Sequence, residues 1–164
     1  MDVRIGFGYD SHQLAENISL FLGGVQIPHA KGCVAHSDGD VLIHALCDAL
    51  LGAAALPDIG SQFPDNNPDF KNIDSKILLS RVVELIENEN FTINNIDITL
   101  LVEKPKIAPY SEQIVRSLQT ILKLDLNRIS LKAKTNEKMG FVGREEGVVA
   151  YAVVTLIKNE RERK

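Results

Sequence analysis

The sequence predicts a two-layer α/β (α+β) domain in which one mixed β-sheet carries its helices on a single face. Three observations lead to this class. Apolar residues recur at every second position in several segments, they recur at helical spacing in others, and the two kinds of segment are interspersed along the chain. The 164 residues have the length of one ordinary domain. We therefore expect a single domain over residues 1–158 and a charged C-terminal tail over 159–164.

The chain begins with a predicted strand. Its odd-numbered residues from Val3 to Tyr9 are apolar or aromatic, and they alternate with arginine and glycine. If the same alternation continues, Asp10 and His12 share one face of the strand.

A hairpin is expected next, because Gly23-Gly24 separates the apolar runs 19–22 and 25–27. Two glycines readily supply the positive φ angles of a tight turn. The chain then passes through a loop at 28–31 toward the first helix.

That helix is predicted from about Gly39 to Ala55, where apolar residues recur at helical spacing. Either Ser37 or Asp38 can cap its start. Pro57 ends it, since proline biases the residue before it away from helical geometry.

Three ionisable residues interrupt the apolar surface of this helix. Asp40, His44 and Asp48 lie four residues apart and so form one stripe. Burying such groups without partners is costly, so a metal ion, a partner or a lined cavity must accompany them.

Residues 57–73 hold three prolines and one glycine without any periodicity, and we expect a long loop. Loops of this length in a compact domain are often binding lids, but a surface excursion explains the pattern equally well. Lys71 is the cation of this segment.

The remaining elements follow the same two periodicities. Asp74 or Ser75 is expected to cap a second helix, and Pro109 to open a third. Strands are expected at 93–102, 129–135 and 147–158. The last of these is apolar on both sides, so we expect the open face of the sheet to pack against copies of itself in a closed symmetric oligomer.

The segment 135–147 combines three glycines with Thr135, Glu137 and Arg144. Such a loop can offer backbone N–H groups and a guanidinium to phosphate oxygens. It can equally be an ordinary connection between strands whose glycines serve turn geometry.

Asp10, His12 and His44 are candidate metal ligands if the first helix packs beside the end of the first strand. Two imidazoles and one carboxylate form a set that suits zinc and leaves a fourth position open for substrate or water. Each residue alone could instead serve an ordinary structural role, and the combination favours the metal site.

Composition limits the class of partner. The net charge of −4 and the isoelectric point near 5.6 argue against nucleic acid and anionic membranes, because both select basic surfaces. Cys33 and Cys47 form no C-x-x-C pair, and we find neither a secretory signal nor a bilayer-spanning apolar run. We expect a soluble cytoplasmic protein with reduced thiols.

Several common site motifs are missing. Gly6-x-Gly8 lacks the third glycine of a dinucleotide fingerprint. The sequence also lacks a Gly-Lys-Ser/Thr phosphate loop, a zinc deaminase pattern and a serine-hydrolase elbow.

Six blocks of sequence carry a resemblance over nearly the whole chain, in order. They are Gly6-Phe-Gly-Tyr-Asp-x-His12, Ala35-His-Ser-Asp-Gly-Asp40, the helix segment from His44 to Leu56, Asp58-Ile-Gly60, Phe63-Pro-Asp65 and Glu137-Lys-x-Gly-Phe-x-Gly-Arg144. With these blocks the chain closely resembles the 2-C-methyl-D-erythritol 2,4-cyclodiphosphate synthase family.

The resemblance implies a homotrimeric lyase of the non-mevalonate isoprenoid pathway, with active sites at subunit interfaces. In the implied reaction, the 2-phosphate of 4-diphosphocytidyl-2-C-methyl-D-erythritol 2-phosphate attacks the β-phosphorus and expels CMP. Two divalent cations would explain how an acidic chain handles a polyanion.

The resemblance also implies residue roles. Zn²⁺ would be held by Asp10, His12 and His44, and Mg²⁺ or Mn²⁺ on the diphosphate by Glu137. His36 and Thr135 match positions that stabilise the transition state. The implied substrate-binding positions are Asp10, His12, His36, Ser37, Asp58, Ile59, Gly60, Phe63, Pro64, Asp65, Lys71, Val102, Lys106, Ile107, Ala108, Lys134, Thr135, Asn136, Glu137, Phe141 and Arg144.

Within that set the parts differ in what they would contact. Asp58 and Gly60 match contacts to the ribose, the segment 63–71 a flap over the methylerythritol phosphate, 102–108 the cytosine pocket, and Phe141 and Arg144 the interface. Lys134 departs from the family, which more often has a small hydroxyl residue there, so its cation either reaches a phosphate or points to solvent.

Two other functions stay open. A zinc-dependent nucleotide-diphosphate hydrolase would use water as the nucleophile in place of the substrate's phosphate. A non-catalytic trimer would only bind isoprenoid diphosphates or nucleotides.

Overall fold

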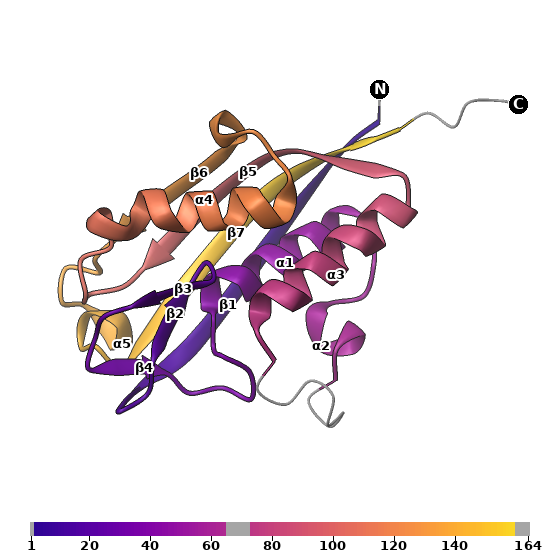
Figure 1. The fold of residues 1–164 in the computed structure, drawn as a ribbon. Coiled ribbons are helices and arrows are strands. Elements are labelled where there is room, and N and C mark those ends of the chain that lie inside the picture. Colours follow the sequence, from indigo (N-terminus) through magenta and orange to yellow (C-terminus); the bar gives the residue numbers. More distant parts are fainter. Residues whose placement is uncertain (1, 65–72, 160–164) are drawn as a thin grey trace, which may run out of the picture.

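Strands and helices are interspersed along the chain as the sequence predicts (Figure 1). The structure is a computed structural model, and it describes residues 2–64 and 73–159. The strands are β1 (Asp2–Glu16), β2 (Leu20–Leu22), β3 (Val25–Ile27), β4 (Lys31–Cys33), β5 (Phe91–Leu101), β6 (Ile129–Lys134) and β7 (Gly147–Lys158). The helices are α1 (Val41–Ala53), α2 (Ile59–Gln62), α3 (Ser75–Asn88), α4 (Ser111–Leu122) and α5 (Gly140–Gly143), with 3₁₀ turns at Ala108–Tyr110 and Leu126–Arg128.

One mixed five-stranded sheet organises the domain, with the strand order β4-β1-β7-β5-β6. β1 and β7 form a long antiparallel ladder in which Asp2 pairs with Lys158 and His12 pairs with Val148. β5 runs antiparallel to β7 and parallel to β6. The predicted hairpin is confirmed, since β2 and β3 pair antiparallel as a separate ribbon.

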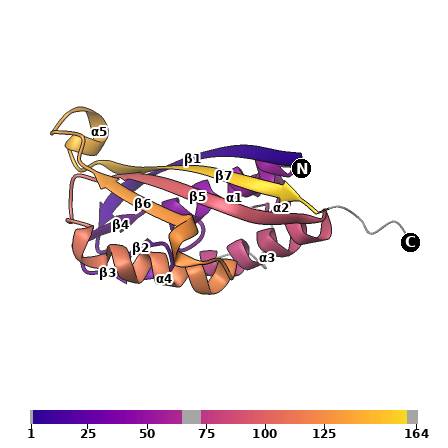
Figure 2. The same ribbon diagram turned by 90° about the horizontal axis from the view of Figure 1, so that it is seen from above.

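The helices α1, α3 and α4 lie on one face of this sheet, and the opposite face is left open (Figure 2). The alternation of β5 explains the core side, because Ile96, Ile98 and Leu100 all point toward the helices and are fully buried. The predicted mixed sheet with one helical layer is therefore confirmed. Within the two described ranges, no helix combines the length and the apolar character needed to cross a bilayer.

Two glycines allow α1 to lie unusually close to β1. A Cβ atom at Gly6 would stand 1.8 Å from the carbonyl oxygen of Ala49, and one at Gly8 would stand 1.8 Å from the carbonyl oxygen of Ala45. Both contacts are far shorter than a van der Waals distance. The even-numbered side of β1 must therefore be bare at these positions, and the helix residues beside Ala45 come close to the strand.

The odd-numbered side of β1 carries the apolar residues, and it faces away from the helices. Ile5 is 72% exposed and Phe7 is 63% exposed, and Val3, Tyr9 and Val153 are also largely exposed. Large apolar patches on a monomer surface usually mark an interaction site.

The structure corrects the predicted start of the first helix. Neither Ser37 nor Asp38 caps α1; Asp40 does, by accepting a hydrogen bond of 3.0 Å from the N–H of Ile43. The same carboxylate also accepts bonds from the Gly23 and Gly24 amides, so the distant hairpin selects this cap. For α3, where two caps were open, Asp74 is the cap.

Two predicted loops contain short helices. The segment 57–73 was expected to be wholly irregular, but α2 occupies its first part, with Asp58 accepting a bond of 2.8 Å from Ser61 N–H. Residues 65–72 of this segment, on which the prediction of a binding lid falls, lie outside the described residues. In the segment 135–147, α5 follows residues Glu137 and Lys138, which both have positive φ.

Candidate functional site

Asp10, His12 and His44 meet at one point, as the sequence predicts. Asp10 Oδ2 lies 3.0 Å from His12 Nε2 and 3.2 Å from His44 Nδ1, and the two ring nitrogens are 3.1 Å apart. Within residues 2–64 and 73–159, this triad is the group of histidine, cysteine and acidic side chains with the spacing of a metal site.

The fold explains why these residues converge. Asp10 and His12 lie on the even-numbered side of β1, the side that Gly6 and Gly8 leave bare for α1. His44 stands in the first turn of α1, directly before Ala45, whose carbonyl lies against Gly8. The close packing of helix on strand therefore sets the geometry of the triad.

The charges in the triad depend on one another. Burial alone would raise the pKa of Asp10, but hydrogen bonds from His12 and His44 outweigh it and lower this pKa to about 2. Burial alone would lower the pKa of His44. The hydrogen bond to Asp10, together with the negative charges of Asp10, Asp40 and Asp38, instead raises the pKa of His44.

The donor set fits a divalent metal ion. Three ligand atoms at about 2.1 Å from one tetrahedral ion would be roughly 3.4 Å apart, close to the observed distances of 3.0 to 3.2 Å. The two ring nitrogens face each other, and two neutral lone pairs at this distance need a proton or a cation between them. A metal ion meets that need at three atoms simultaneously.

The two acids of the α1 stripe have partners outside the triad. Asp40 is fully buried and accepts hydrogen bonds from three backbone amides. Asp48 is half-buried and accepts one bond of 2.8 Å from the N–H of Ile59. The expectation that the stripe needs partners is confirmed, but only His44 finds them in the candidate metal site.

Behind His44 lies a pair of residues that sequence reasoning did not place in the site. The pair is Ser75 and Asp38. The Nε2 atom of His44 is 3.0 Å from the Ser75 hydroxyl, which in turn donates a short hydrogen bond to Asp38. Ser37 Oγ is 3.3 Å from the same nitrogen. Ser75 is 31 residues from His44 in the chain, and no spacing rule links a residue at the start of α3 to one in α1.

The predicted ribose contacts lie at the start of α2, with Asp58 as its N-cap. Asp58 and Gly60 are exposed, and Ile59 is tied to α1 through its bond with Asp48. Phe63 is partly buried against the core, while Pro64 is exposed. Two further predicted substrate contacts, Asp65 and Lys71, lie outside the described residues.

A second group of predicted residues gathers at the ends of the parallel strands β5 and β6. The Val102 N–H donates to the Lys134 carbonyl at 2.9 Å, and the Asn136 N–H donates to the Glu103 carboxylate at 3.1 Å. These bonds place the segment 102–108 beside 134–137. Val102 and Ile107 are buried there, whereas Lys106, Ala108 and Lys134 are exposed.

Polar contacts fix the loop after β6. The Thr135 hydroxyl donates to the Glu137 carboxylate at 2.5 Å. Arg144 forms a two-pronged pair with Glu146, at 2.9 and 3.0 Å, and Phe141 is 44% exposed. These side chains are accessible on the surface of a single chain.

The triad and this second group do not meet within one chain. β1 and β6 are separated by β7 and β5, so Thr135 lies about three strand spacings, roughly 14 Å, from His12. Glu137 is therefore not part of the triad. His36 is exposed in the segment before α1, and it too is absent from the cluster that the described residues form.

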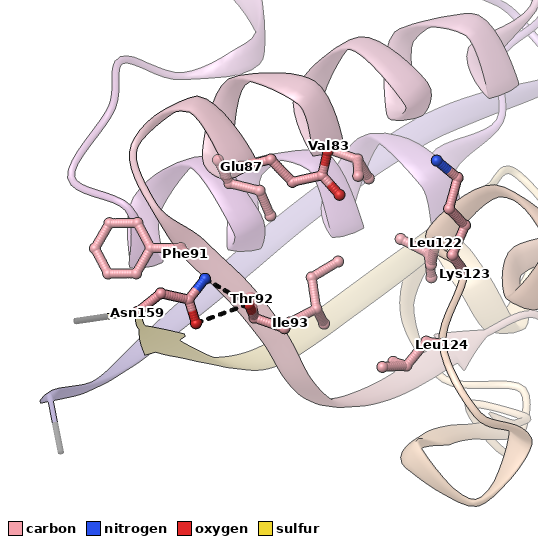
Figure 3. A pocket seen from close by; sticks show the side chains of 10 residues that line it. Val83, Glu87, Phe91, Thr92, Ile93, Leu122, Lys123, Leu124 and Asn159 are labelled. Carbon is pink, nitrogen blue, oxygen red and sulfur yellow. Dashed lines mark hydrogen bonds between the residues drawn. The ribbon is translucent and has the colours of Figure 1, made fainter. Parts of the chain in front are cut away.

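A separate cavity of about 320 Å³ lies between α3, α4 and the start of β5 (Figure 3). Buried Phe91 and Leu122 contribute to its lining, with Glu87 and Lys123 as charged residues of opposite sign. Asn159, which also lines it, follows Lys158, the partner of Asp2 at the far end of the β1–β7 ladder. The cavity is thus about 25 Å from the triad along β1.

The fold and the triad define a class of protein: an α/β domain with an Asp-His-His cluster, spaced as metal ligands are, between a sheet and its helical layer. Comparison with known proteins gives the family. The model described as the YgbB family matches residues 3–157, nearly the whole chain, and the chain therefore belongs to this family.

Two relatives carry the name 2-C-methyl-D-erythritol 2,4-cyclodiphosphate synthase. The protein of Porphyromonas gingivalis is 54% identical over 154 residues, which covers 94% of this chain and 95% of that protein. The protein of Prosthecochloris aestuarii is 55% identical over 151 residues, which covers 92% of this chain and 96% of that protein.

Solved structures show the same fold. The bifunctional IspDF from Campylobacter jejuni superposes with a TM-score of 0.93 at 42% identity; the match covers 97% of this chain but only 43% of that longer chain. The CDP complex of IspF from Plasmodium falciparum gives a TM-score of 0.84 at 38% identity, covering 96% of this chain and 97% of that one.

Proposed function

We propose that this chain is a metal-dependent lyase that cyclises 4-diphosphocytidyl-2-C-methyl-D-erythritol 2-phosphate to 2-C-methyl-D-erythritol 2,4-cyclodiphosphate and releases CMP, in isoprenoid precursor biosynthesis. The convergence of Asp10, His12 and His44 carries this proposal. Membership of the YgbB family and full-length relatives that bear the synthase name support the substrate and the reaction.

The reaction is a phosphoryl transfer within one molecule. An oxygen of the 2-phosphate attacks the β-phosphorus, and the new P–O bond closes the ring. The bond from the β-phosphorus to the oxygen that bridges to the α-phosphorus breaks, and this oxygen leaves with CMP and the electron pair. Such a transfer needs an in-line geometry and neutralisation of developing charge, but little covalent help from the protein.

We assign the metal ligands from the donor chemistry. Asp10, His12 and His44 would hold Zn²⁺, and Glu137 would contact Mg²⁺ or Mn²⁺ on the diphosphate. When bound, these ions supply positive charge to phosphate oxygens. The chain orients the ligands, since β1 and α1 fix the three side chains before any substrate arrives.

The other roles are proposals for the substrate's two ends. His36 and Thr135 would donate hydrogen bonds to the transferring phosphoryl group. Asp58, Ile59 and Gly60 would bind the ribose, and the segment 102–108 would hold the cytosine. The buried Val102 and Ile107 offer that segment an apolar floor.

A homotrimer would join the two groups of residues. The triad and the 134–137 loop lie roughly 14 Å apart on one chain, and β1 exposes an apolar stripe on the open face of the sheet. Packing three open faces together would bury this stripe and would bring one chain's triad to another chain's loop. Light scattering should then give a mass of about three times the 18.1 kDa chain.

We also place the protein in the cytoplasm, where the buried thiols of Cys33 and Cys47 would stay reduced.

Product analysis tests the reaction. The purified protein, incubated with the cytidyl substrate, Zn²⁺ and Mg²⁺, should give the cyclic diphosphate and CMP in equal amounts. An open monophosphate product would instead identify a nucleotide-diphosphate hydrolase. Binding of the substrate without any product would identify a non-catalytic binding protein.

The variant His44→Ala tests the metal centre. Removing one of three ligands should abolish zinc retention and turnover together. Full turnover in this variant without bound zinc, as measured by elemental analysis, would count against the proposed centre.

A further inference from the structure

The two nitrogens of the His44 ring face different environments. Nδ1 points into the triad, 3.2 Å from Asp10 Oδ2 and 3.1 Å from His12 Nε2. Nε2 points the other way, 3.0 Å from Ser75 Oγ and 3.3 Å from Ser37 Oγ. A neutral imidazole has one N–H and one lone pair, so these partners decide which nitrogen can bind a metal ion.

The proton of the Ser75 hydroxyl is already committed. It donates to Asp38 Oδ1, and a hydroxyl has only one proton to donate. Ser75 Oγ can therefore only accept from His44 Nε2. That direction places the proton of a neutral His44 ring on Nε2. Asp10 Oδ2 can also accept a proton, from Nδ1 at 3.2 Å, but His12 Nε2 lies nearer to this oxygen, at 3.0 Å, and can supply its hydrogen bond, which leaves the lone pair on Nδ1.

Backbone donors hold the Asp38 carboxylate in place, and they fix the direction of the hydrogen bond from the Ser75 hydroxyl to Asp38. Its Oδ2 accepts a bond of 2.9 Å from the Ser75 N–H, and its Oδ1 accepts one of 3.2 Å from the Asp40 N–H. Backbone amides can only donate, so Asp38 meets them as an acceptor on both oxygens. Ser75 is fully buried, so its contacts are shielded from bulk solvent.

We propose that Asp38 and Ser75 form a positioning pair that holds His44 in the Nε2–H tautomer and so presents Nδ1 to the metal. Neither residue touches the metal position; each acts through the His44 ring. The predicted effect on zinc affinity rests on the proposed metal centre. The tautomer does not, because it exists in the metal-free protein as well. Partners of this kind raise metal affinity by fixing the orientation and the proton of the ligand.

The tautomer can be measured directly. Two-bond ¹⁵N–¹H correlation spectra of the metal-free, ¹⁵N-histidine-labelled protein should show His44 with its proton on Nε2 at a pH where the ring is neutral. In Ser75→Ala, the signals should move toward a mixture of both tautomers. A wild-type His44 with its proton on Nδ1 would overturn the proposal without any mutant.

Zinc affinity supplies the second readout. Competition with a chromogenic chelator should show about a 10- to 100-fold weaker zinc affinity for Ser75→Ala, as is typical when a ligand loses its outer partner. Asp38→Asn should weaken binding in the same direction, because its single amide oxygen cannot replace two carboxylate oxygens, one of which accepts from the Ser75 hydroxyl and the Asp40 N–H and the other from the Ser75 N–H. Ser80→Ala is the matched control: it removes an exposed hydroxyl from the same helix, where it bonds only to the Lys76 carbonyl, and it should leave both readouts unchanged.

The outcomes separate this inference from the metal centre itself. If the wild-type protein binds no zinc but shows the Nε2–H tautomer, the positioning pair stands and the metal proposal fails. If zinc binds tightly and neither Ser75→Ala nor Asp38→Asn changes affinity or tautomer, the positioning pair is wrong while the metal centre stands. Ser75→Ala failing to fold would leave Asp38→Asn and the wild-type spectrum to decide.

Discussion

Asp10 and Asp40 are two carboxylates close to His44, and they have opposite surroundings. Asp40 is fully buried, and three backbone amides donate to it. Asp10 keeps a quarter of its side-chain surface exposed, and its Oδ2 atom faces two imidazoles. A carboxylate satisfied by the backbone holds the fold together, whereas one that faces other metal-binding side chains is available for chemistry.

The pKa directions follow the same contrast. Burial raises the pKa of Asp40, although the hydrogen bonds from Gly24, Ile43 and Gly23 oppose this shift. At Asp10 burial acts in the same direction, but the two histidines overcome it. The backbone amides around Asp40 do not titrate, whereas the imidazoles around Asp10 do. A metal ion can replace the protons of these imidazoles.

Among Asp10, Asp40 and Asp48, the variant Asp10→Ala should give the largest effect on function. Removing the carboxylate takes away one of three proposed ligands, and zinc affinity should fall on the order of 1000-fold, given that a four-ligand zinc site is worth about 10 to 16 kcal/mol. Turnover should fall with it. Chelator competition measures the affinity, and an unchanged value would remove Asp10 from the metal centre.

Asp40→Ala should show the opposite pattern. Three amide donors would lose their acceptor in the interior, which should cost on the order of 3 kcal/mol of the free energy of unfolding. Under conditions in which the variant stays folded, its zinc affinity should change much less than that of Asp10→Ala. Urea denaturation measures the stability, and a neutral result would mean that the cap is not what docks the β2–β3 hairpin on α1.

The pH dependence of zinc binding sharpens the comparison at His44. A protonated ring cannot bind the metal, and the pKa of His44 lies above its usual 6.5 because Asp10 accepts its hydrogen bond and Asp10, Asp40 and Asp38 add negative charge, outweighing burial. Zinc affinity should therefore still rise above pH 6.5, by up to about tenfold per pH unit for this proton. Titrations between pH 6 and 8.5 measure this slope, and a flat profile would contradict it.

The metal-free protein should respond to pH in the reverse sense. A raised folded-state pKa means that His44 contributes stability below the unfolded value of 6.5, and this contribution is lost as the pH rises through the folded value. Unfolding curves with and without a chelator should therefore diverge as the pH increases. Parallel curves would mean that His44 does not exchange its proton for the metal ion.

The triad could be predicted from the sequence because its parts obey local rules. The period of two in β1 places Asp10 and His12 on one face, and the helical period places His44 one turn into α1. The resemblance to a family then supplied the pairing of strand with helix. Local periodicity did not say which side of β1 faces α1, and the close approach at Gly6 and Gly8 decides that.

What the sequence did not reveal depends on contacts between distant segments. Asp40 replaces Ser37 and Asp38 as the cap because the amides of Gly23 and Gly24 converge on it, and no pattern around residue 40 records this. Ser75 reaches His44 only after α3 has packed beside α1. The 134–137 loop stays apart from the triad on one chain, because β7 and β5 lie between β1 and β6.

Asp48 lies between the two extremes and gives the smallest predicted effect. It is half-buried, and its one backbone partner is the Ile59 N–H on α2, which also carries Asp58 and Gly60. Asp48→Ala removes one hydrogen bond worth about 1 kcal/mol, so KM for the cytidyl substrate should rise about fivefold while kcat changes little, since α2 would touch the ribose and not the reacting phosphate. Asp48→Asn keeps an oxygen that can accept from Ile59 and should restore KM. If kcat falls in Asp48→Ala while KM stays constant, Asp48 acts on the triad and not on the ribose site, and this second acid of the α1 stripe would belong with Asp10.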